Sequence, residues 1–451
     1  MNKRKRISLL VISGPEVRAF VHSGLVHDLS TQYDVSLIVR VPSSSVFQSI
    51  PDASVSNLPT SEEPPPLVRL RSLARESKIA WLGSQGKAKW RHYLPTKPLN
   101  APTRKDCLLW LKSRALIARS LATLERRLGV WQGTNPTWKD LFLRLQTDCL
   151  ISAGFSSAAA ISAMQTASNI GVKTVVVTNS WKDIYVCPHI PVPPDRVVVW
   201  NARTKEYLLA ANPHLIADRI SISPSLHLQH FLVGGQIMSR ADLCNLVGLD
   251  HARPFISYTA ASPTAVENEE KIVAALMNAV DTGALPQQLQ VLLRLNPMED
   301  GQRFGQLRAK YRNLIIQKPS WVWDSKLDWC CALKQDTDIW CATVNHAAMN
   351  VSVPSTATLE FAALGRHVVN VCFDLDPSVA PERSARRFWL ADFYADIREA
   401  QIATPAFTFD ELQAKIAQRL SGNGETARIA SRRETGNPVR HILESVHSFF
   451  H

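Results

Sequence analysis

The chain has 451 residues, of which 45% are hydrophobic and 20% charged, the proportions of a globular protein with more than one domain. Its formal net charge of +12 indicates an anionic partner, such as a phosphate-bearing substrate, an acidic membrane surface or nucleic acid. No apolar run in the sequence is long enough to span a membrane, and the eight cysteines show no spacing typical of metal ligands. We therefore expect no membrane-spanning helix, no bound metal, no disulfides and a cytoplasmic location.

The N-terminal residues imitate a signal peptide but lack its cleavage site. A basic leader is followed by a short apolar run at 7–12, which ends near Gly14 without the small residues that suit cleavage. We predict a buried strand at 7–12, a helix at 16–29 and a second strand at 35–39. This alternation is typical of a doubly wound parallel sheet, in which the loop at 14–18 lies where ligands bind.

Residues 56–115 interrupt the alternation with a basic segment. Its basic and aromatic residues are Arg69, Arg71, Arg75, Lys78, Trp81, Lys87, Lys89, Trp90, Arg91, Tyr93, Lys97, Arg104 and Lys105. One interpretation is contact with a membrane, because basic side chains attract anionic headgroups and tryptophan prefers the headgroup level. An equally weighted alternative is a solvated helical insertion with tryptophan in a local core. Nucleic acid is the least favoured partner, because no DNA- or RNA-binding module is recognisable.

The alternation then resumes. We predict strands at 148–154 and 172–177, with a helix at 156–170 between them. The loop after the second of these strands carries Ser180, Trp181, Lys182 and Asp183. The Asp183 carboxylate either faces a cleft at the carboxyl edge of the sheet or caps the following turn, and the sequence leaves both possibilities open.

A second set of strands follows a polar crossover. We predict strands at 254–259, 290–293 and 314–316, the order expected of a second α/β unit. The loop after the first of them contains Ala261 and Ser262. Small residues at this position let the backbone approach a ligand closely.

Charged residues near these strands have competing interpretations. Arg294 directly follows the strand at 290–293, where its guanidinium can bind a phosphate bidentately or form a surface ion pair. Asp336 and Asp338 precede a predicted helix. We expect these two carboxylates at the surface or as a helix cap rather than as metal ligands.

The most informative stretch follows the pattern strand, turn, helix, strand. A β-branched run at 349–353 predicts a strand that Pro354 ends, and apolar residues at helical spacing then predict a helix that Gly365 terminates. The next strand, at 368–373, is followed by Asp374. In a parallel sheet Asp374 would lie at the same edge as the helix start.

The start of this helix is suited to a nucleotide. Ser355 or Thr356 can cap it, and its free N–H groups and positive dipole end suit a phosphate. Glu360 lies one turn further along, where its carboxylate can accept two hydrogen bonds from a ribose diol. A diphosphate beside a ribose is what a nucleotide sugar offers. The alternative, an ordinary capped helix with a solvated Glu360, carries equal weight on this stretch alone.

This element resembles the donor site of GT-B glycosyltransferases, in particular bacterial surface-polysaccharide transferases and their CDP-glycerol glycerophosphotransferase relatives. The resemblance rests on Ser355, Thr356, Glu360 and Gly365, followed by an apolar strand. Weaker matches occur in the same order along the chain, at Gly14, Arg18, Ser180, Trp181 and Arg294. The shared order of these motifs makes the resemblance more specific than any single one of them.

The resemblance implies an α/β protein of the GT-B fold, with two Rossmann-like domains facing each other across a cleft and a basic helical insertion in the first domain. We expect an acceptor domain at 1–215 with the insertion at about 56–115, followed by a crossover linker at 216–250. The donor domain would be 251–435, and a C-terminal helix at 436–451 would cross back to the first domain.

The function that the resemblance implies is transfer of a sugar from a nucleotide-sugar donor to a cell-surface glycan or lipid-linked acceptor, without a metal or further cofactor. The donor residues would be Ala261, Ser262, Arg294, Pro354, Ser355, Thr356, Glu360 and Asp374. The acceptor side would include Gly14, Arg18, Ser180 and Trp181. The candidates for the base that takes the acceptor proton are Glu16, His22 and Asp183. The location would be cytoplasmic, with peripheral contact to the inner membrane face as an option.

Two other functions stay open at this point. A glycerophosphotransferase or a nucleotide-sugar epimerase would share the fold. A non-catalytic, membrane-associated binding subunit is favoured by Asn296 and Asp392, which stand where the relatives carry histidine. Activity on a nucleotide sugar would separate these cases.

Overall fold

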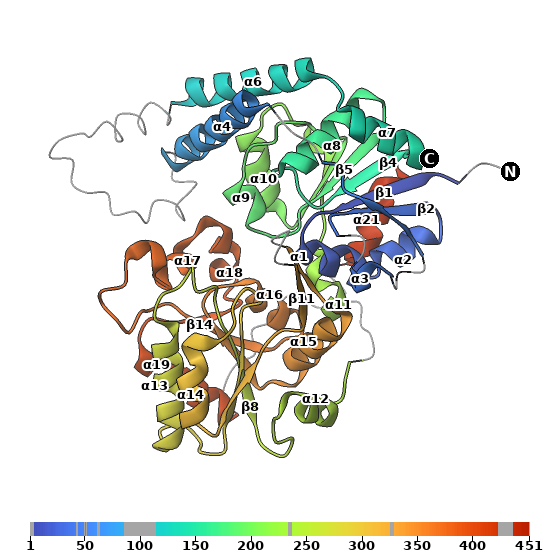
Figure 1. Ribbon diagram of the computed structural model, residues 1–451. Helices are drawn as coiled ribbons and strands as arrows, with labels where there is room; N and C mark the ends of the chain where they lie inside the picture. The colour runs from blue at the N-terminus through green and yellow to red at the C-terminus, as the bar shows by residue number, and fades with distance from the viewer. Residues whose placement is uncertain are drawn as a thin grey trace.

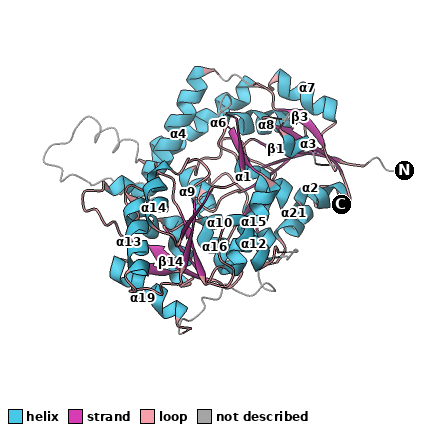
Figure 2. Ribbon diagram, turned by 60° about the horizontal axis from the view of Figure 1, so that its bottom comes forward, coloured by secondary structure: helices cyan, strands magenta, loops and turns pink. Residues whose placement is uncertain are grey.

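The computed structural model contains two parallel β-sheets, each covered by helices. It describes residues 4–41, 44–48, 50, 52–60, 64–84, 114–232, 237–324, 329–422 and 436–450. In Figure 1 the first half of the chain, blue to green, lies above the second half, yellow to orange, and the red C-terminal helix returns to the upper half. Figure 2 shows the helices surrounding the strands of both sheets.

The first sheet has seven strands in the order β3-β2-β1-β4-β5-β6-β7, all parallel. Their bounds are β1 Arg6–Val11, β2 Asp34–Val39, β3 Ser54–Asn57, β4 Cys149–Ser152, β5 Lys173–Val177, β6 Arg196–Val199 and β7 Ile220–Ile222. The central strands β1 and β4 are buried along nearly their whole length, as expected when helices cover both faces of a parallel sheet. The strand order reverses between β1 and β4, so the loops after these two strands open a crevice.

The second sheet has six strands in the order β10-β9-β8-β13-β14-β15, again all parallel. Their bounds are β8 Phe255–Thr259, β9 Gln290–Arg294, β10 Leu314–Gln317, β13 Met349–Ser352, β14 His367–Val371 and β15 Thr404–Ala406. The predicted pair of Rossmann-like domains is therefore confirmed. The strand order reverses between β8 and β13, which places the loops after both strands beside one crevice.

Helices connect the strands within each half. Those of the first half are α1 Gly14–Glu16, α2 Leu25–Ser30, α3 Ser45–Gln48, α4 Pro65–Ser84, α6 Ala115–Gln132, α7 Pro136–Leu145, α8 Ala158–Asn169, α9 Asp183–Val186, α10 Ala202–Ala211 and α11 Gln229–Leu232. Those that follow are α12 Arg240–Val247, α13 Glu269–Asp281, α14 Gly305–Lys310, α15 Lys334–His346, α16 Thr356–Ala363, α17 Arg386–Leu390, α18 Ala395–Glu399, α19 Phe409–Leu420 and α21 Pro438–His447. Val439, Ile442 and Val446 of α21 are buried in one core with β1. The last helix of the chain thus completes the first half of the molecule.

The basic segment predicted at 56–115 forms helix α4 within its described part, and α6 begins where the segment ends. Figure 1 shows this pair of helices at the outer edge of the first half. The basic and aromatic residues from Lys87 to Lys105 lie outside the described residues. Lys78, expected on a basic surface, is instead buried, and its ammonium contacts His189 Nδ1 at 3.1 Å and Asn212 Oδ1 at 2.9 Å. The pair is therefore anchored to the first half by a buried polar contact.

The helix predicted at 16–29 is broken into three pieces. The short α1 is followed by a π-helix at Val17–His22, and α2 begins only after Gly24, whose φ of 88° lies in the left-handed region. A wide turn of this kind is often found at functional sites. Gly24 permits the break, because it has no side chain to clash in the left-handed conformation.

A two-stranded antiparallel hairpin, β11 Trp321–Asp324 and β12 Trp329–Ala332, joins the two halves and was not predicted. The Trp329 indole N–H donates to the Ile12 carbonyl at 3.1 Å. A Cβ atom on Gly14 would lie 1.9 Å from the Cys330 carbonyl oxygen. The loop after β1 can therefore meet the hairpin only with glycine at this position.

Candidate functional site

A cavity of about 360 Å³ opens between the carboxyl edges of the two sheets. It brings together predicted residues from both halves, namely Arg18, Trp181, Ala261, Ser262, Arg294, Pro354, Ser355, Thr356 and Glu360. These residues come from the π-helix after β1, the loops after β5, β8 and β13, the end of β9 and the first turns of α16. This convergence is the arrangement in which open α/β sheets bind ligands.

The start of α16 forms one wall of the cavity. Ser355 is the N-cap residue, but its hydroxyl makes no capping hydrogen bond, contrary to the expectation that Ser355 or Thr356 would cap the helix with its side chain. The Ser355 Oγ atom is buried and has no hydrogen-bond partner among the described residues. The first N–H groups of a helix also lack partners within it. An unsatisfied hydroxyl and the positive end of a helix therefore point at the same space.

Glu360 is held from two sides within this wall. Its side chain is 4% exposed, and its Oε1 atom accepts a hydrogen bond from the Arg18 guanidinium at 2.7 Å. Its Oε2 atom accepts from the Trp340 indole N–H at 2.8 Å. The Arg18 contact joins the two halves across the cavity. The Nε atom of Arg18 is buried without a partner among the described residues, so the guanidinium keeps one free donor.

The guanidinium of Arg294 has hydrogen-bond partners within the protein. Its guanidinium donates to Gln317 Oε1 at 3.0 Å and to Asp336 Oδ2 at 2.8 Å, and its Cζ atom lies 4.9 Å from the centre of the Trp340 ring. Asp336 is 3% exposed and also accepts from the Trp321 indole N–H at 2.9 Å. The expectation that Asp336 lies at the surface or acts as a cap is wrong, because it is the buried partner of Arg294.

The buried side chain of Glu269 holds the small loop after β8 in place. The Ala261 N–H donates to the Glu269 carboxylate at 3.0 and 3.2 Å, and Glu269 is fully buried with Arg303 3.2 Å away. Burial raises the pKa of Glu269 to about 7. Ala261 therefore offers close backbone approach to the cavity and no free N–H.

The remaining predicted residues are not part of this lining. Asp183 accepts from the Ser180 N–H at 2.7 Å, so its carboxylate closes the turn at 180–183 that precedes α9 and does not cap that helix. Burial raises the pKa of Asp183 to about 6. The Asp374 carboxylate accepts from Ser384 Oγ and from the Ala385 N–H, which holds the loop before α17.

The other two candidate bases lie in the first half of the chain. The Glu16 carboxylate accepts from the N–H groups of Ile12 and Ser13, and burial, with a further contribution from nearby Asp183, raises its pKa to about 7. His22 lines a different cavity and contacts Thr337 Oγ1 through Nδ1 at 3.0 Å. Burial lowers the His22 pKa to about 4, so its imidazole is neutral at pH 7.

The charge of the cavity is mixed. Among the described residues that line it, the basic side chains are Arg18, Lys182 and Arg294 and the acidic ones are Asp336 and Glu360. Each acidic side chain is ion-paired with an arginine, and Lys182 is exposed. No group of three or more His, Cys, Asp or Glu side chains suited to a metal ion occurs in the described part of the chain. The cavity is thus suited to an anion held by helix N–H groups and basic side chains.

Sequence reasoning missed Trp340 and the role of Asp336. Both belong to α15, and both contact residues that the sequence had singled out, Glu360 and Arg294. The available signal was an indole and a carboxylate four positions apart, which share one helix face. That signal is weak, because such pairs are common on ordinary helices.

No family model and no curated protein sequence matches the chain. Solved structures resemble it in shape. The UDP-GlcNAc 2-epimerase from Neisseria meningitidis bound to UDP-GlcNAc is 10% identical, with a TM-score of 0.53 over 98% of this chain and 100% of that one. The S. aureus MnaA-UDP co-structure is 10% identical, with a TM-score of 0.56 over 99% and 97%.

A third solved structure shows the same likeness. The UDP-GlcNAc 2-epimerase from Methanocaldococcus jannaschii is 9% identical, with a TM-score of 0.56 over 98% of this chain and 99% of that one. At such identities the likeness shows the fold, and the predicted GT-B fold is confirmed over nearly the whole chain. Separately, no helix in the described residues is long and apolar enough to cross a bilayer.

Proposed function

We propose that the cavity binds a nucleoside diphosphate sugar and that the protein transfers its sugar to an acceptor on the first-half side of the crevice. The observation that carries the proposal is the N-terminus of α16, where the Ser355 hydroxyl is buried and has no partner among the residues that the structure describes. A buried hydroxyl without a partner is costly, and a phosphate oxygen would satisfy it. The diphosphate is the group that this end of the helix suits best.

Other residues that line the cavity would supply the remaining contacts with the nucleotide. The loop at Ala261 and Ser262 lets a phosphate approach the backbone, and Lys182 and the free Nε atom of Arg18 offer positive charge from the first half. Glu360 would accept from the ribose hydroxyls, which requires Arg18 to exchange the carboxylate for the phosphate. The helix dipole and these cations would stabilise the phosphate that leaves during transfer.

Transfer also requires that the acceptor hydroxyl lose a proton. Glu16, with its pKa raised to about 7, has the acidity suited to a general base near neutral pH. It lies behind the loop after β1 rather than in the described lining, so an acceptor would have to reach it from the first-half side.

A second candidate function is epimerisation of the nucleotide sugar, which the likeness to UDP-GlcNAc 2-epimerase structures favours. Inverting a carbon that carries hydrogen requires that a proton be removed from one face and returned to the other. The two carboxylates that line the described cavity, Asp336 and Glu360, are both ion-paired. Nucleotide binding would release Glu360 from Arg18 in either function. Epimerisation would in addition require proton-transferring groups at both faces of the sugar carbon, whereas transfer requires a base only at the acceptor.

One experiment separates these functions. The protein is first tested for binding by thermal unfolding with UDP-, GDP-, CMP- and CDP-linked compounds, since a ligand at about a hundred times its Kd adds about 2.7 kcal/mol of stability. The ligand that binds is then incubated with the protein alone and with glycan or lipid-linked acceptors, and the products are followed by NMR. Release of nucleotide that depends on the acceptor supports transfer, and a new sugar epimer formed without acceptor supports epimerisation.

The variant Glu360→Gln tests the site. Its control is Glu444→Gln, which changes an exposed residue of α21. Binding lost in the first variant and kept in the second would place the nucleotide at α16. Folded protein that binds none of the nucleotides would contradict the proposal.

A further inference from the structure

Three leucines of helix α6 face outward. The exposed fractions are 77% for Leu116, 48% for Leu124 and 38% for Leu128. The buried face of the same helix carries the small Ala118 and the carboxylate of Glu125, each 1% exposed. The hydrophobic effect would favour the opposite arrangement in an isolated globular protein. The outward leucines therefore have no function in the core of this chain.

Basic side chains flank these leucines. Residues three or four positions apart share one helix face, so Leu124 and Leu128 lie together, and Arg119 and Arg127 follow Leu116 and Leu124 by three positions. Both arginines are exposed. The single acidic residue of α6 is Glu125, which is buried against Arg71 and His189. The outward face is thus apolar and positive, with no negative charge of its own.

Helix α4, which packs against α6, also exposes apolar side chains. Val68 and Leu73 are 46% and 43% exposed, and Arg69 beside them is exposed as well. Five of the fourteen large hydrophobic side chains that are exposed in the described part of the chain belong to α4 and α6. Scattered apolar side chains are normal on a protein surface, whereas a concentration of them marks an interaction site.

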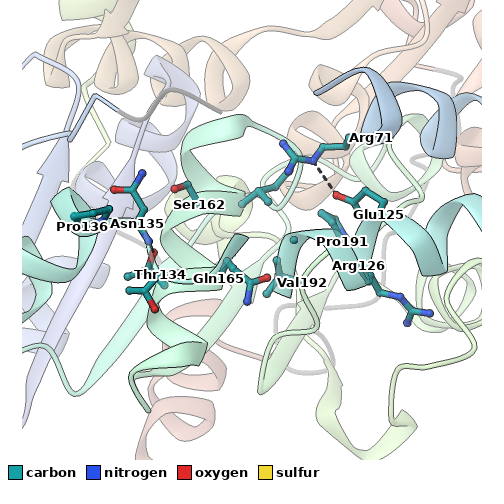
Figure 3. Close-up of a pocket in the computed structure, with 14 residues that line it drawn as sticks. Arg71, Glu125, Arg126, Thr134, Asn135, Pro136, Ser162, Gln165, Pro191 and Val192 are labelled. Atoms are coloured by element: carbon teal, nitrogen blue, oxygen red, sulfur yellow. Dashed lines mark hydrogen bonds and ion pairs between the residues drawn. The ribbon is translucent and has the colours of Figure 1, made fainter. Parts of the chain in front are cut away.

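The helix pair is held rigidly to the first half. Arg71 of α4 and Glu125 of α6 are joined at 3.0 Å, and Figure 3 shows this pair in the wall of a cavity of about 210 Å³ between α6, α7 and α8. Glu125 also contacts His189 at 3.1 Å, and Lys78 joins His189 to Asn212. A partner bound to the outward face of α6 would therefore orient the whole first half.

We propose that the outward face of α6, formed by Leu116, Arg119, Leu124, Arg127 and Leu128, docks onto an anionic lipid bilayer. A helix with leucines flanked by arginines lies in the plane of the interface, with the leucines among the acyl chains and the guanidinium groups at the phosphates. A nucleic acid would bind the arginines through its phosphates but would leave the leucines exposed to water. A second copy of this chain would present the same positive face and repel it.

The docking surface is independent of the nucleotide site. It uses residues of α6 that do not line the cavity beneath α16, so loss of nucleotide binding would leave it intact. The described residues contain no helix able to span a bilayer, and contact at the surface is the mode that the α6 face suits.

The test is flotation of the full chain with vesicles of phosphatidylcholine, with and without phosphatidylglycerol. We expect binding only to the anionic vesicles, and binding that weakens as salt is raised. The double variant Arg119→Ala/Arg127→Ala should weaken partitioning by about fivefold for each arginine removed. The double variant Leu116→Ser/Leu124→Ser should weaken it by about tenfold or more.

Matched controls are Leu246→Ser, a leucine that is also 48% exposed but lies on α12, and Arg312→Ala, an exposed arginine of the second half. Both controls should float like the unmodified chain, and all variants should unfold at unchanged temperature because the side chains are exposed. Failure to bind anionic vesicles would overturn the proposal. So would α6 variants that float like the controls, or a dimer in solution that only the α6 variants dissociate.

Discussion

Arg18 and Glu360 form an ion pair of 2.7 Å that crosses from the first half of the molecule to the second, within the cavity between them. The two residues are 342 positions apart in the sequence. Their side chains are 18% and 4% exposed, so the pair is largely withdrawn from water. The pair holds the carboxylate that we propose for the ribose and the guanidinium that we propose for the phosphate in contact with each other. Nucleotide binding would exchange this contact for two contacts with the ligand.

The first prediction concerns the coupling of this pair. Arg18→Met leaves the buried Glu360 with Trp340 as its one remaining partner among the described residues, and removal of one member of a buried pair costs about 3–5 kcal/mol. In the double variant Arg18→Met/Glu360→Gln no charge is left unpaired, so it should be more stable than Arg18→Met alone. The measurement is the midpoint of thermal unfolding of both single variants and the double variant. Strictly additive losses would show that the two residues do not interact.

The second prediction separates stability from binding at Ser355. Its hydroxyl is buried without a partner among the described residues, so Ser355→Ala removes an unsatisfied group and should leave the unfolding temperature unchanged or raise it. If the hydroxyl donates to a phosphate, the same variant should bind the nucleotide about tenfold more weakly. Calorimetric titration with the nucleotide, beside thermal unfolding, checks both effects. A variant that loses stability and keeps its affinity would contradict the phosphate role.

The third prediction concerns the close contact at Gly14. A Cβ atom there would lie 1.9 Å from the Cys330 carbonyl oxygen, and its nearest neighbours are backbone atoms of Cys330 and Cys331 that cannot rotate away. Gly14→Ala should therefore separate the hairpin from the loop after β1 and destabilise the protein by about 1–3 kcal/mol or more. Hydrogen exchange at β12 should rise at the same time. Gly154→Ala is the control, because a Cβ atom at Gly154 has no atom within 4 Å. Equal effects of the two substitutions would refute the steric explanation.

The fourth prediction concerns pH. Burial raises the pKa of Glu16 from its ordinary 4.5 to about 7, so in this range the folded chain keeps a proton that the unfolded chain has lost. The resulting stabilisation is present below about pH 4.5 and is lost as the pH rises through about 7. Glu16→Gln removes this dependence and should gain stability over the original chain as the pH rises across that window. Thermal unfolding across the pH range measures it, with the exposed Glu444→Gln as control. Parallel curves for the original chain and Glu16→Gln would mean that Glu16 titrates normally.

Sequence alone determined the two-domain α/β plan and the position of the helix at Ser355. Both depend on local patterns, since apolar runs bounded by Gly and Pro identify β13, α16 and β14 without knowledge of the rest of the chain. The break at Gly24 was missed because apolar spacing continues through the π-helix, and periodicity does not register a local change of hydrogen bonding.

Tertiary structure alone decided how the charged side chains are paired. Arg18 with Glu360 and Arg294 with Asp336 are contacts between segments far apart in the sequence, and neither residue type nor spacing specifies which opposite charge lies nearby. The same limit applies to α6, because the spacing of its leucines does not say whether their stripe is buried or exposed. The structure turns that stripe outward because Lys78 and Glu125 fix the opposite face of the helix pair to the first half. Periodicity in a sequence determines which residues share a face, and only the fold decides whether that face meets protein or solvent.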